Sequence, residues 1–380
     1  MTAETLFIIA ILFYLLVMSS LVYGFDRMAV FKLSDKKAKT KFSVVIPFRN
    51  EAANLPALLQ SLSELEYPKS HFEILLINDD STDNSDNIIN EFLKLENSKL
   101  NIDIRVISNI RNTDSPKKDA ITLAAKKAKN DWILTTDADC ILPKYWLDVF
   151  DEKIQLTDAV AIVGPITLIK ENAFINKFQS LEILALQGAT IGGFGIKRPL
   201  MCNGANFCYS KFAFYECGGF EGNTDIASGD DLFLLEKLTK RFKNKVHYLK
   251  AESAIVLTKP ENTLKGLIQQ RLRWTSKNSN YSNWLTKIVG LIVFMGNLSL
   301  IMLLPLVIFN IVGNRVAIAL LVIKLSIDFL LLFKAARFFN RENCLNSFLL
   351  SSFIYPMFSV YIVFLSLFSS YDWKGRTFRK

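Results

Sequence analysis

Long apolar runs lie near both ends of the chain. The first, Leu6 to Gly24, carries no charge. A run of this length can cross a hydrocarbon layer about 30 Å thick, which needs roughly 20 helical residues. We interpret it as a membrane anchor over residues 1–25, because it is long for a cleaved signal and lacks a small-residue cleavage site. A cleaved signal is the alternative interpretation.

Three further apolar runs predict a membrane region over residues 288–371, which a basic tail, residues 372–380, follows. Lys324 and Asp328 are four residues apart in the run from Val316 to Phe333. They can therefore pair on one face of its helix, and that face would point into a helix bundle. Three full crossings would leave the basic tail outside although its charge favours the inside, so either the last run is a hairpin or the charge rule fails here. The runs are Ile288 to Asn310, Val316 to Phe333, and Ser347 to Ser370, interrupted by Pro356.

Between these ends, short apolar runs alternate with helical periodicity. The alternation predicts an α/β domain over residues 41–287, with a mostly parallel sheet and helices on both of its faces. Ligands of such sheets lie beyond the carboxyl ends of the strands. The expected strands are Phe42 to Phe48, Phe72 to Asp79, Ile102 to Ser108 and Asp131 to Asp137, and the expected helices cover about 51–65, 85–95 and 117–129.

Acidic side chains cluster at these strand ends. Asp79 ends the second run, and Asp137 and Asp139 end the fourth. Two carboxylates at i and i+2 of a strand face the same way, and Mg²⁺ or Mn²⁺ takes one or two protein carboxylates and completes its shell with water and phosphate. The sequence has no glycine-rich phosphate loop of the dinucleotide or Walker type, so a bound diphosphate would need such a cation. An ordinary solvated turn is the alternative for the same residues.

A second acidic pair, Asp230 and Asp231, stands at the start of a helical pattern. Gly229 before the pair permits a tight turn. The positive end of the helix dipole favours an ionised Asp231 and lowers the pKa expected for it. A residue of this pair could simply cap the helix.

Gln270, Arg273 and Trp274 are spaced i, i+3 and i+4, which places them on one face of a helix. Arginine can pair with phosphate, and the tryptophan ring can contact an acceptor. The alternative is a basic helix that lies at the membrane surface.

The charge distribution and the cysteine content indicate the cellular compartment of the protein. The net charge is +9, and its densest run, FKLSDKKAKTK, directly follows the first apolar run. That position indicates the cytosolic flank of a membrane helix rather than a surface for nucleic acid. Five cysteines without a Cys-x-x-Cys pair indicate neither a disulfide framework nor a zinc site and suit a reducing compartment. We expect an integral protein of the inner cell membrane with a cytosolic catalytic domain.

Five motifs follow one another in the middle of the chain: VVIPFRNE, INDDSTD, TDADC, SGDDLFLL and QQRLRW. In this order they resemble the membrane-bound, Gln-x-x-Arg-Trp branch of the family 2 glycosyltransferases over about residues 41–274. The resemblance implies a GT-A fold, which is Rossmann-like, and a nucleotide-sugar donor, with a UDP-sugar expected. Asn78, Asp80 and Asp230 depart from the commoner aspartate, glycine and glutamate, which puts the choice of donor in doubt more than the reaction.

The resemblance also implies roles for the matching residues. Asp231 would be the general base, with Asp230 beside it, and Asp137 and Asp139 would hold Mg²⁺ or Mn²⁺. Acceptor binding would fall to Asn203, Gly204 and Trp274. Donor binding would fall to Pro47, Glu51, Asp79, Lys118, Asp137, Gln270 and Arg273.

A soluble donor and a site at the bilayer imply an acceptor that resides in the membrane. The leading hypothesis is an inverting, metal-dependent transfer to a lipid or lipid-linked acceptor. A processive polysaccharide synthase is the alternative that the Gln-x-x-Arg-Trp motif favours, although three C-terminal segments are few for a channel. A non-catalytic membrane scaffold is the alternative of another class, and intact Asp137, Asp139 and Asp231 argue against it. The sequence does not predict an oligomeric state.

Overall fold

The computed structural model describes the chain except for residues 1–2, 101, 277–282 and 379–380. The chain divides into two compact units. We call them the α/β unit (Ala29–Ile169 and Met201–Lys259) and the helical unit (Met1–Met28, Lys170–Leu200 and Pro260–Lys380).

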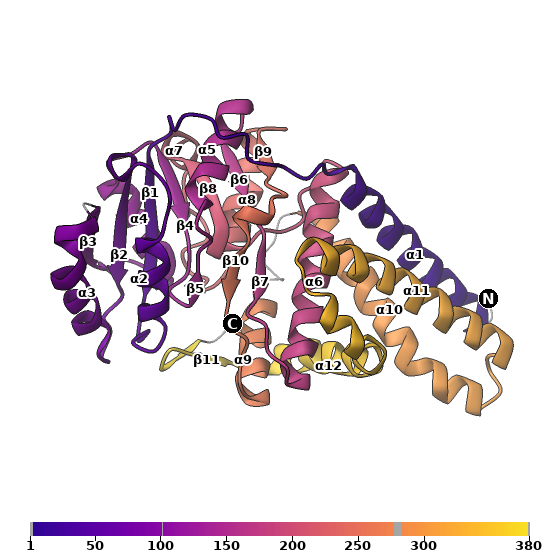
Figure 1. The fold of residues 1–380 in the computed structure, drawn as a ribbon. Helices are drawn as coiled ribbons and strands as arrows, with labels where there is room; N and C mark the ends of the chain where they lie inside the picture. Colours follow the sequence, from indigo (N-terminus) through magenta and orange to yellow (C-terminus); the bar gives the residue numbers. More distant parts are fainter. Residues whose placement is uncertain (1–2, 101, 277–282, 379–380) are drawn as a thin grey trace. The chain divides into compact units, whose positions relative to one another are not determined.

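The larger sheet of the α/β unit is mostly parallel, as the sequence predicts (Figure 1). Its seven strands have the order β3-β2-β1-β4-β8-β6-β9. Strands β3, β2, β1 and β4 are parallel neighbours, β8 is antiparallel to both β4 and β6, and β9 is parallel to β6. The strands are β1 (Phe42–Phe48), β2 (Phe72–Asn78), β3 (Asp103–Ser108), β4 (Trp132–Thr135), β6 (Ala161–Val163), β8 (Phe207–Ser210) and β9 (Val246–Tyr248).

The first three expected helices are confirmed, with shifted bounds. The first begins at Leu55 rather than near Glu51, with Pro56 near its start, where proline is tolerated. Strands β1 and β2 are buried almost throughout, as expected of strands covered on both faces. The helices of this unit are α2 (Leu55–Ser63), α3 (Ser85–Leu100), α4 (Pro116–Lys127), α5 (Trp146–Leu156), α7 (Lys211–Glu216) and α8 (Asp230–Arg241), with short 3-10 turns η1 (Lys69–His71), η2 (Gly204–Asn206) and η3 (Glu252–Ala254).

The fourth strand is shorter than its apolar pattern predicts. It ends at Thr135, so Asp137 and Asp139 lie in the turn that leads to β5 (Cys140–Ile141). Strand β5 belongs to a separate sheet, in which it pairs with β10 (Val256–Thr258), the neighbour of β7 (Ile166–Leu168). The expectation that both carboxylates extend from one strand is therefore wrong, because they project from a turn between two sheets.

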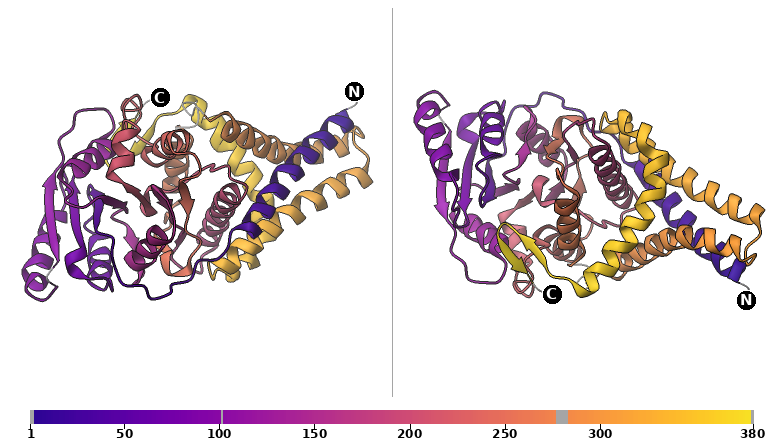
Figure 2. Two further views of the ribbon diagram at one scale, coloured as in Figure 1. Left: turned by 90° about the horizontal axis from the view of Figure 1, so that it is seen from above. Right: turned by 90° about the horizontal axis from the view of Figure 1, so that it is seen from below.

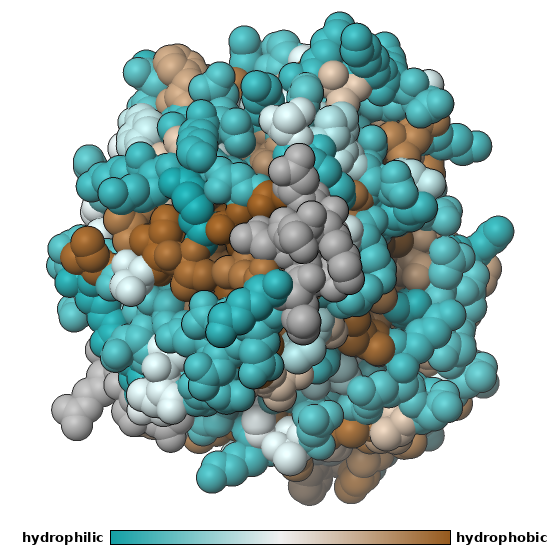
Figure 3. All heavy atoms as spheres, turned by 60° about the vertical axis from the view of Figure 1, so that its left-hand side comes forward, coloured by the Kyte–Doolittle hydropathy of each residue, from teal (hydrophilic) through white to brown (hydrophobic). Residues whose placement is uncertain are grey.

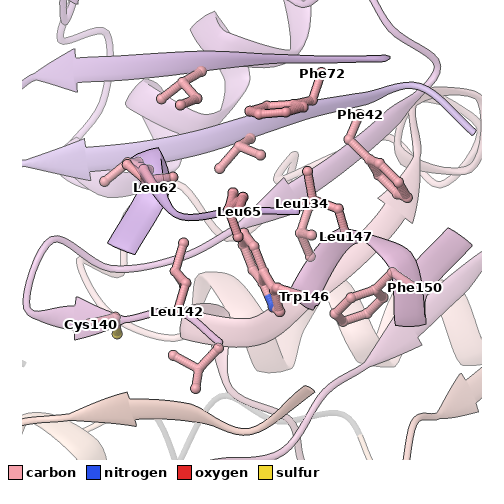
Figure 4. Close-up of a cluster of buried hydrophobic side chains, with 14 of the residues drawn as sticks. Phe42, Leu62, Leu65, Phe72, Leu134, Cys140, Leu142, Trp146, Leu147 and Phe150 are labelled. Atoms are coloured by element: carbon pink, nitrogen blue, oxygen red, sulfur yellow. The ribbon is translucent and has the colours of Figure 1, made fainter. Parts of the chain in front are cut away.

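A buried cluster beneath these sheets fixes the backbone near the turn. Figure 4 shows Trp146 and Phe150 of α5 among side chains of this core. Trp146 Nε1 donates a hydrogen bond to Asn206 Oδ1 over 3.0 Å. Asn206 Nδ2 in turn donates to the carbonyls of Pro165 and Ala254, each over 2.8 Å. Because all polar atoms of this amide have partners, it holds the η2 segment in one position.

The basic segment after the first apolar run is tied to α5. The Glu152 carboxylate accepts hydrogen bonds from the backbone N–H groups of Ser34 and Lys36, and Asp151 accepts from that of Thr40. The lysine side chains of this segment stay exposed. Hydrophilic residues also predominate on the face that Figure 3 shows.

Four helices of the helical unit are long and apolar enough to cross a membrane, judged by length and composition over the described residues. In both views of Figure 2, α1 lies beside α10 and α11. The side chains of Phe13, Leu304 and Phe368 are 59%, 68% and 86% exposed, which is typical of helix surfaces that face lipid. The four helices are α1 (Ala3–Arg27), α10 (Trp284–Ile308), α11 (Asn314–Phe338) and α12 (Phe348–Phe368), the last preceded by η5 (Glu342–Ser347).

The last apolar run is one helix. Helix α12 continues through Pro356, which contradicts the hairpin, one of the two alternatives that the sequence left open. Proline is tolerated within membrane helices when neighbouring groups satisfy the freed carbonyl. In the basic tail, for which the sequence predicted no secondary structure, β11 (Tyr371–Trp373) and β12 (Arg376–Phe378) form an antiparallel hairpin beside α9 (Leu264–Thr275). Residues 379 and 380 of that tail lie outside the described residues.

Helix α6 (Phe174–Gly195) and α9 are part of the helical unit, although the sequence pattern grouped them with the α/β domain. The contact of α6 with α1 is close enough that a Cβ on Gly192 would collide with the backbone of Leu21. A Cβ on Gly24 would collide with the backbone of Gly192 in the same way. Glycine at both positions therefore lets the two helix backbones touch.

Candidate active site

One ammonium group joins the two acidic segments of the α/β unit. Lys117 Nζ lies 2.7 Å from Asp137 Oδ1 and 3.4 Å from Asp230 Oδ2. Burial by itself would lower the pKa of Lys117, but the charges of Asp137, Asp230 and Asp231 outweigh burial and raise that pKa above its ordinary value. Lys117 is therefore charged at neutral pH, and its side chain keeps 20% of its surface exposed to a ligand.

The second carboxylate of α8 is held from the η2 segment. Asp231 Oδ2 accepts a hydrogen bond from the backbone N–H of Gly204 over 3.2 Å, and its Oδ1 accepts from Leu232 N–H over 2.8 Å. Gly229 has φ of +85°, the left-handed conformation in which glycine is favoured, and α8 begins directly after it. The helix start predicted at Asp230 and Asp231 is confirmed.

Glycine at position 204 permits this close approach. A Cβ there would lie 3.0 Å from Asp230 Oδ2 and 3.4 Å from Lys117 Nζ. The carbonyl of Gly204 accepts a hydrogen bond from Thr135 Oγ1 over 2.7 Å, which ties η2 to the end of β4. Asn203 caps the same turn by accepting from Ala205 N–H over 2.9 Å. The structure thus brings Asn203 and Gly204 next to the two acidic segments.

Asp79 occupies a separate, basic corner at the ends of β1, β2 and β3. Only 6% of Asp79 is exposed, and its Oδ1 accepts hydrogen bonds from Asn109 Nδ2 and Arg111 Nε, each over 2.9 Å. Arg49 donates to the Asp79 carbonyl over 2.7 Å. The carboxylate is therefore held in one orientation before any ligand arrives.

The two other residues expected near the nucleoside lie on adjoining segments. Pro47 is the neighbour of Ile77 near the carboxyl ends of β1 and β2. Glu51 follows β1. Its carboxylate accepts a hydrogen bond from Asn54 Nδ2 over 2.6 Å, and its backbone N–H donates to Ser85 Oγ over 3.0 Å.

Lys118, which the resemblance assigns to donor binding, is buried to 1% exposure. Its Nζ donates hydrogen bonds of 2.6 Å to the carbonyls of Asn223 and Ile226. Consecutive helical residues point about 100° apart, so only one of the two lysines of α4 can face the acidic segments. That residue is Lys117.

Gln270, Arg273 and Trp274 lie on α9 in the helical unit, and the helix predicted for them is confirmed. Gln270 Nε2 donates to Glu261 Oε1 over 3.2 Å. Arg271, which the sequence reading passed over, donates from Nε and Nη2 to Glu182 Oε2 over 2.9 and 2.7 Å. Its guanidinium carbon also lies 4.1 Å from the centroid of the Trp274 ring.

Sequence reasoning missed several residues of the site. Arg49 directly follows β1, and Arg111 comes three positions after the end of β3 at Ser108. The carboxyl ends of these two strands share one edge of the sheet, so the strand pattern could have indicated both residues. Lys117 gave no such signal, because its neighbour in the sequence is also a lysine.

Asp137 and Asp139 supply oxygen ligands of the kind that Mg²⁺ and Mn²⁺ prefer. The Asp137 side chain is 36% exposed. Among the residues that the structure describes, no group of three or more His, Cys, Asp or Glu side chains is placed to hold a metal. The two carboxylates fit an ion that completes its shell with phosphate and water, and they do not form a closed protein cage.

Residues 43–221 match the family model described as "Glycosyl transferase family 2". This match agrees with the resemblance to family 2 glycosyltransferases that the motifs of the same region led us to expect. A solved structure, the mannosyltransferase PcManGT from Pyrobaculum calidifontis in complex with GDP-Man and Mn²⁺, has a TM-score of 0.56 at 15% identity and covers 94% of this chain and 97% of its own. This likeness concerns the fold, and it confirms the expected α/β class of the GT-A type with flanking apolar helices.

Relatives by sequence are glycosyltransferases. The "Probable glycosyltransferase YdaM" of Bacillus subtilis is 28% identical over 64% of this chain and 56% of its own length. The "Poly-beta-1,6-N-acetyl-D-glucosamine synthase" of Staphylococcus epidermidis is 26% identical over 66% and 57%. The "Undecaprenyl-phosphate 4-deoxy-4-formamido-L-arabinose transferase" of Shewanella sediminis is 38% identical over 26% and 28%. The chain thus spans little more than half the length of the first two.

Proposed function

We propose that the protein transfers a sugar, with inversion at the anomeric carbon, from a nucleotide-sugar donor to a lipid or lipid-linked acceptor in the membrane. A UDP-sugar is the expected donor. The observation that carries the proposal is the meeting of Asp137 and Asp230 at Lys117, with Asp231 in the same helix turn. A leaving diphosphate needs a positive charge nearby, and an attacking hydroxyl needs a carboxylate that takes its proton. This arrangement supplies both groups side by side.

Asp231 is the proposed general base. The acceptor oxygen bonds to the anomeric carbon as the bond to the diphosphate breaks, and Asp231 takes the hydroxyl proton. General-base catalysis of this kind contributes roughly 10² to 10⁴ in rate. The Gly204 N–H fixes the direction of the Asp231 carboxylate, so that it faces one hydroxyl position rather than many.

Lys117 is the proposed resident cation for the diphosphate, in place of Lys118. Its charge is maintained by three surrounding carboxylates, and a fixed cation stabilises charge that develops on a leaving group. A divalent ion held by Asp137 and Asp139 would add Lewis-acid stabilisation of that diphosphate when bound. Asp139 partly faces solvent, as such a ligand must.

Asp79 and Glu51 are the proposed nucleoside contacts. Asp79 is already oriented by Arg111 and Asn109, and a preoriented carboxylate binds ligand hydroxyl or N–H groups with little loss of conformational freedom. Pro47 lies on the same edge of the sheet.

The proposed acceptor follows from the helical unit. Its four apolar helices suit an integral membrane protein, and the lysine-rich segment after α1 favours a cytosolic α/β unit at the inner membrane. The short similarity to an undecaprenyl-phosphate transferase supports a lipid-linked acceptor. We assign Gln270, Arg273 and Trp274 of α9 to the diphosphate and the acceptor.

The test uses the full chain in vesicles made from a bacterial lipid extract. A panel of UDP- and GDP-sugars is supplied with Mn²⁺ or Mg²⁺, and nucleoside diphosphate release and lipid-extractable sugar are measured. We expect release with one donor class and a product of inverted anomeric configuration by NMR. Absence of release with every donor, in vesicles that contain the extracted lipids, would contradict the proposal.

A processive polysaccharide synthase is the second candidate. The similarity to the poly-N-acetylglucosamine synthase over two thirds of this chain favours it, as does the Gln-x-x-Arg-Trp spacing. Product length separates the two candidates, because a single transfer yields one added sugar for each acceptor. Polymer from purified protein would favour the synthase.

A further inference from the structure

A long loop, Cys217 to Gly229, delivers Asp230 and Asp231 to the site. It connects the end of α7 at Glu216 with the start of α8 at Asp230. It contains three glycines with positive φ besides Gly229: Gly218, Gly219 and Gly222. Glycines of this kind do not by themselves fix a backbone, so the position of the loop depends on what holds it.

The N-terminal turn of α4 holds this loop. Lys118 Nζ donates to the carbonyls of Asn223 and Ile226, and Ser115 Oγ donates to the carbonyl of Ala227 over 3.3 Å. From the other side, Lys237 of α8 donates to the carbonyls of Gly219 and Glu221 over 2.8 and 2.7 Å. The three carbonyls held from α4 lie within the seven positions before Asp230.

We propose that Lys118 is a positioning residue for the general base. Its ammonium fixes the loop that leads to Asp230 and Asp231, while the adjacent Lys117 contacts their carboxylate site directly. That Asp231 is the base rests on the proposed function. The hydrogen bonds by which Lys118 holds the loop do not depend on it.

The burial and the contacts of Lys118 favour this positioning role over direct binding of a ligand. Only 1% of Lys118 is exposed, its ammonium lies 4.9 Å from the centroid of the Phe233 ring, and both of its carbonyl partners belong to the loop. A buried ammonium is retained only where partners compensate its desolvation. Here the backbone of the loop supplies compensation, so loss of the charge also leaves the carbonyls of Asn223 and Ile226 without this donor.

Adjacent lysines on one helix thus have different tasks. Lys117 sets the charge balance among three carboxylates, and Lys118 sets where the α8 start lies. Replacement of either residue lowers turnover for a different reason, and this difference makes the proposal testable.

The test compares Lys118→Met with Lys118→Gln, and takes Lys126→Met as the matched control, because Lys126 is exposed on the same helix. Amide hydrogen exchange over residues 221–231 is measured first, since it needs no substrate. In Lys118→Met we expect exchange to become about tenfold faster or more, because loss of a charged hydrogen-bond donor frees the loop. Lys118→Gln should recover part of the protection, because its amide can donate to both carbonyls. Lys126→Met should match the wild type.

Ligand binding and turnover complete the test. With UDP and Mn²⁺ as the probe, Lys118→Met should bind as the wild type does, while kcat falls by about 10- to 100-fold, the cost of a small misplacement of a catalytic group. Lys117→Met should instead weaken UDP binding as well, because it removes a cation from the proposed diphosphate site.

Two results would overturn the proposal: unchanged exchange over residues 221–231 in Lys118→Met, or loss of UDP binding as large as the loss of turnover. The second would make Lys118 a donor ligand. Should Lys118→Met fail to fold, Lys118→Gln carries the same comparison. If the wild type releases no nucleoside diphosphate, the proposed function fails, whereas the exchange result still decides whether Lys118 holds the loop.

Discussion

Lys117 and Asp137 are 20 positions apart in the chain, and the hydrogen bond from Lys117 Nζ to Asp137 Oδ1 measures 2.7 Å. The same ammonium lies 3.4 Å from Asp230. The turn after β4 and the start of α8 therefore converge on one positive charge. Each carboxylate favours the protonated form of the lysine, so the ammonium keeps its charge between them.

Replacement of Lys117 by Met should lower turnover and weaken UDP binding. Without the ammonium, Asp137 and Asp230 lose the cation that lies between them, and the leaving diphosphate loses a fixed positive charge. The measurement is UDP affinity and kcat/KM of Lys117→Met beside Lys126→Met. Values equal to those of the wild type would mean that Lys117 takes no part in the site.

Asp231→Asn should retain donor binding and lose turnover. The amide is nearly isosteric and can still meet the N–H of Gly204 through its oxygen, but it cannot take up the acceptor proton. We expect kcat to fall about 10² to 10⁴-fold, with UDP binding, measured by calorimetry, close to that of the wild type. Near-normal turnover in this variant would remove Asp231 from the role of base.

Asp139→Ala should abolish the metal dependence of donor binding. A divalent ion that relies on two protein carboxylates loses most of its site when one is deleted. The measurement is UDP affinity with and without Mn²⁺, with Asp131→Ala as a control because Asp131 is exposed and lies before β4. If Mn²⁺ improved UDP binding equally in Asp139→Ala and the wild type, the ion would bind elsewhere.

Asp148 on α5 should make the stability of the protein depend on pH. Burial, together with the charges of Asp151 and Glu152, raises the pKa of Asp148 from 3.8 to about 6, and its Oδ2 is buried without a hydrogen bond. Because the folded-state pKa is the higher one, the stabilisation is fully present below about pH 4 and is lost as the pH rises through 6.

Asp148→Asn removes this titration. We expect its free energy of unfolding at pH 7 to exceed that of the wild type by about 1 to 2 kcal/mol, after allowance for partial exposure. The difference should shrink toward pH 4. Thermal unfolding across this pH range measures it, with Asp131→Asn as the exposed control. A difference that is independent of pH would contradict the assignment.

Strands β1 and β2 could be predicted because both faces of the sheet are covered there, whereas β5 to β10, each only two to four residues long, were not predicted. Continuous apolar runs such as Phe42 to Phe48 leave little choice of structure, and the observed β1 has the same bounds. The acidic turn was harder to predict, because the stretch ILTTDADC (Ile133 to Cys140) begins in one sheet and ends in another. Pairing of β5 with β10, about 115 positions later in the chain, ends β4 at Thr135.

The roles of the two α4 lysines could not be read from the sequence. A rotation of about 100° on the helix decides which ammonium faces Asp137, and no local pattern fixes that rotation. The grouping of α6 with the apolar helices was equally hidden, because it depends on backbone contacts between Gly24 and Gly192. Long-range partners set both features.

Lys324 and Asp328 were predicted to pair, and the structure confirms a 2.7 Å contact within α11. The pair is shielded inside the helical unit, with side chains 4% and 18% exposed. The structure adds Tyr14 of α1, whose hydroxyl donates to Asp328 Oδ1. Charged groups inside a membrane-spanning helix bundle are costly unless they are paired. Through the hydrogen bond of Tyr14 to Asp328, the pair also links the N-terminal anchor α1 to α11.

Removal of one partner should therefore cost more than removal of both. Lys324→Met leaves an uncompensated carboxylate and should destabilise the protein by about 3 to 5 kcal/mol, whereas Lys324→Met combined with Asp328→Leu should be close to neutral. Tyr14→Phe should cost about 1 kcal/mol, the value of one hydrogen bond. Unfolding in detergent micelles, followed by tryptophan fluorescence, measures all three. Equal losses in the single and double variants would mean that the pair is not a buried ionic contact but a solvated one.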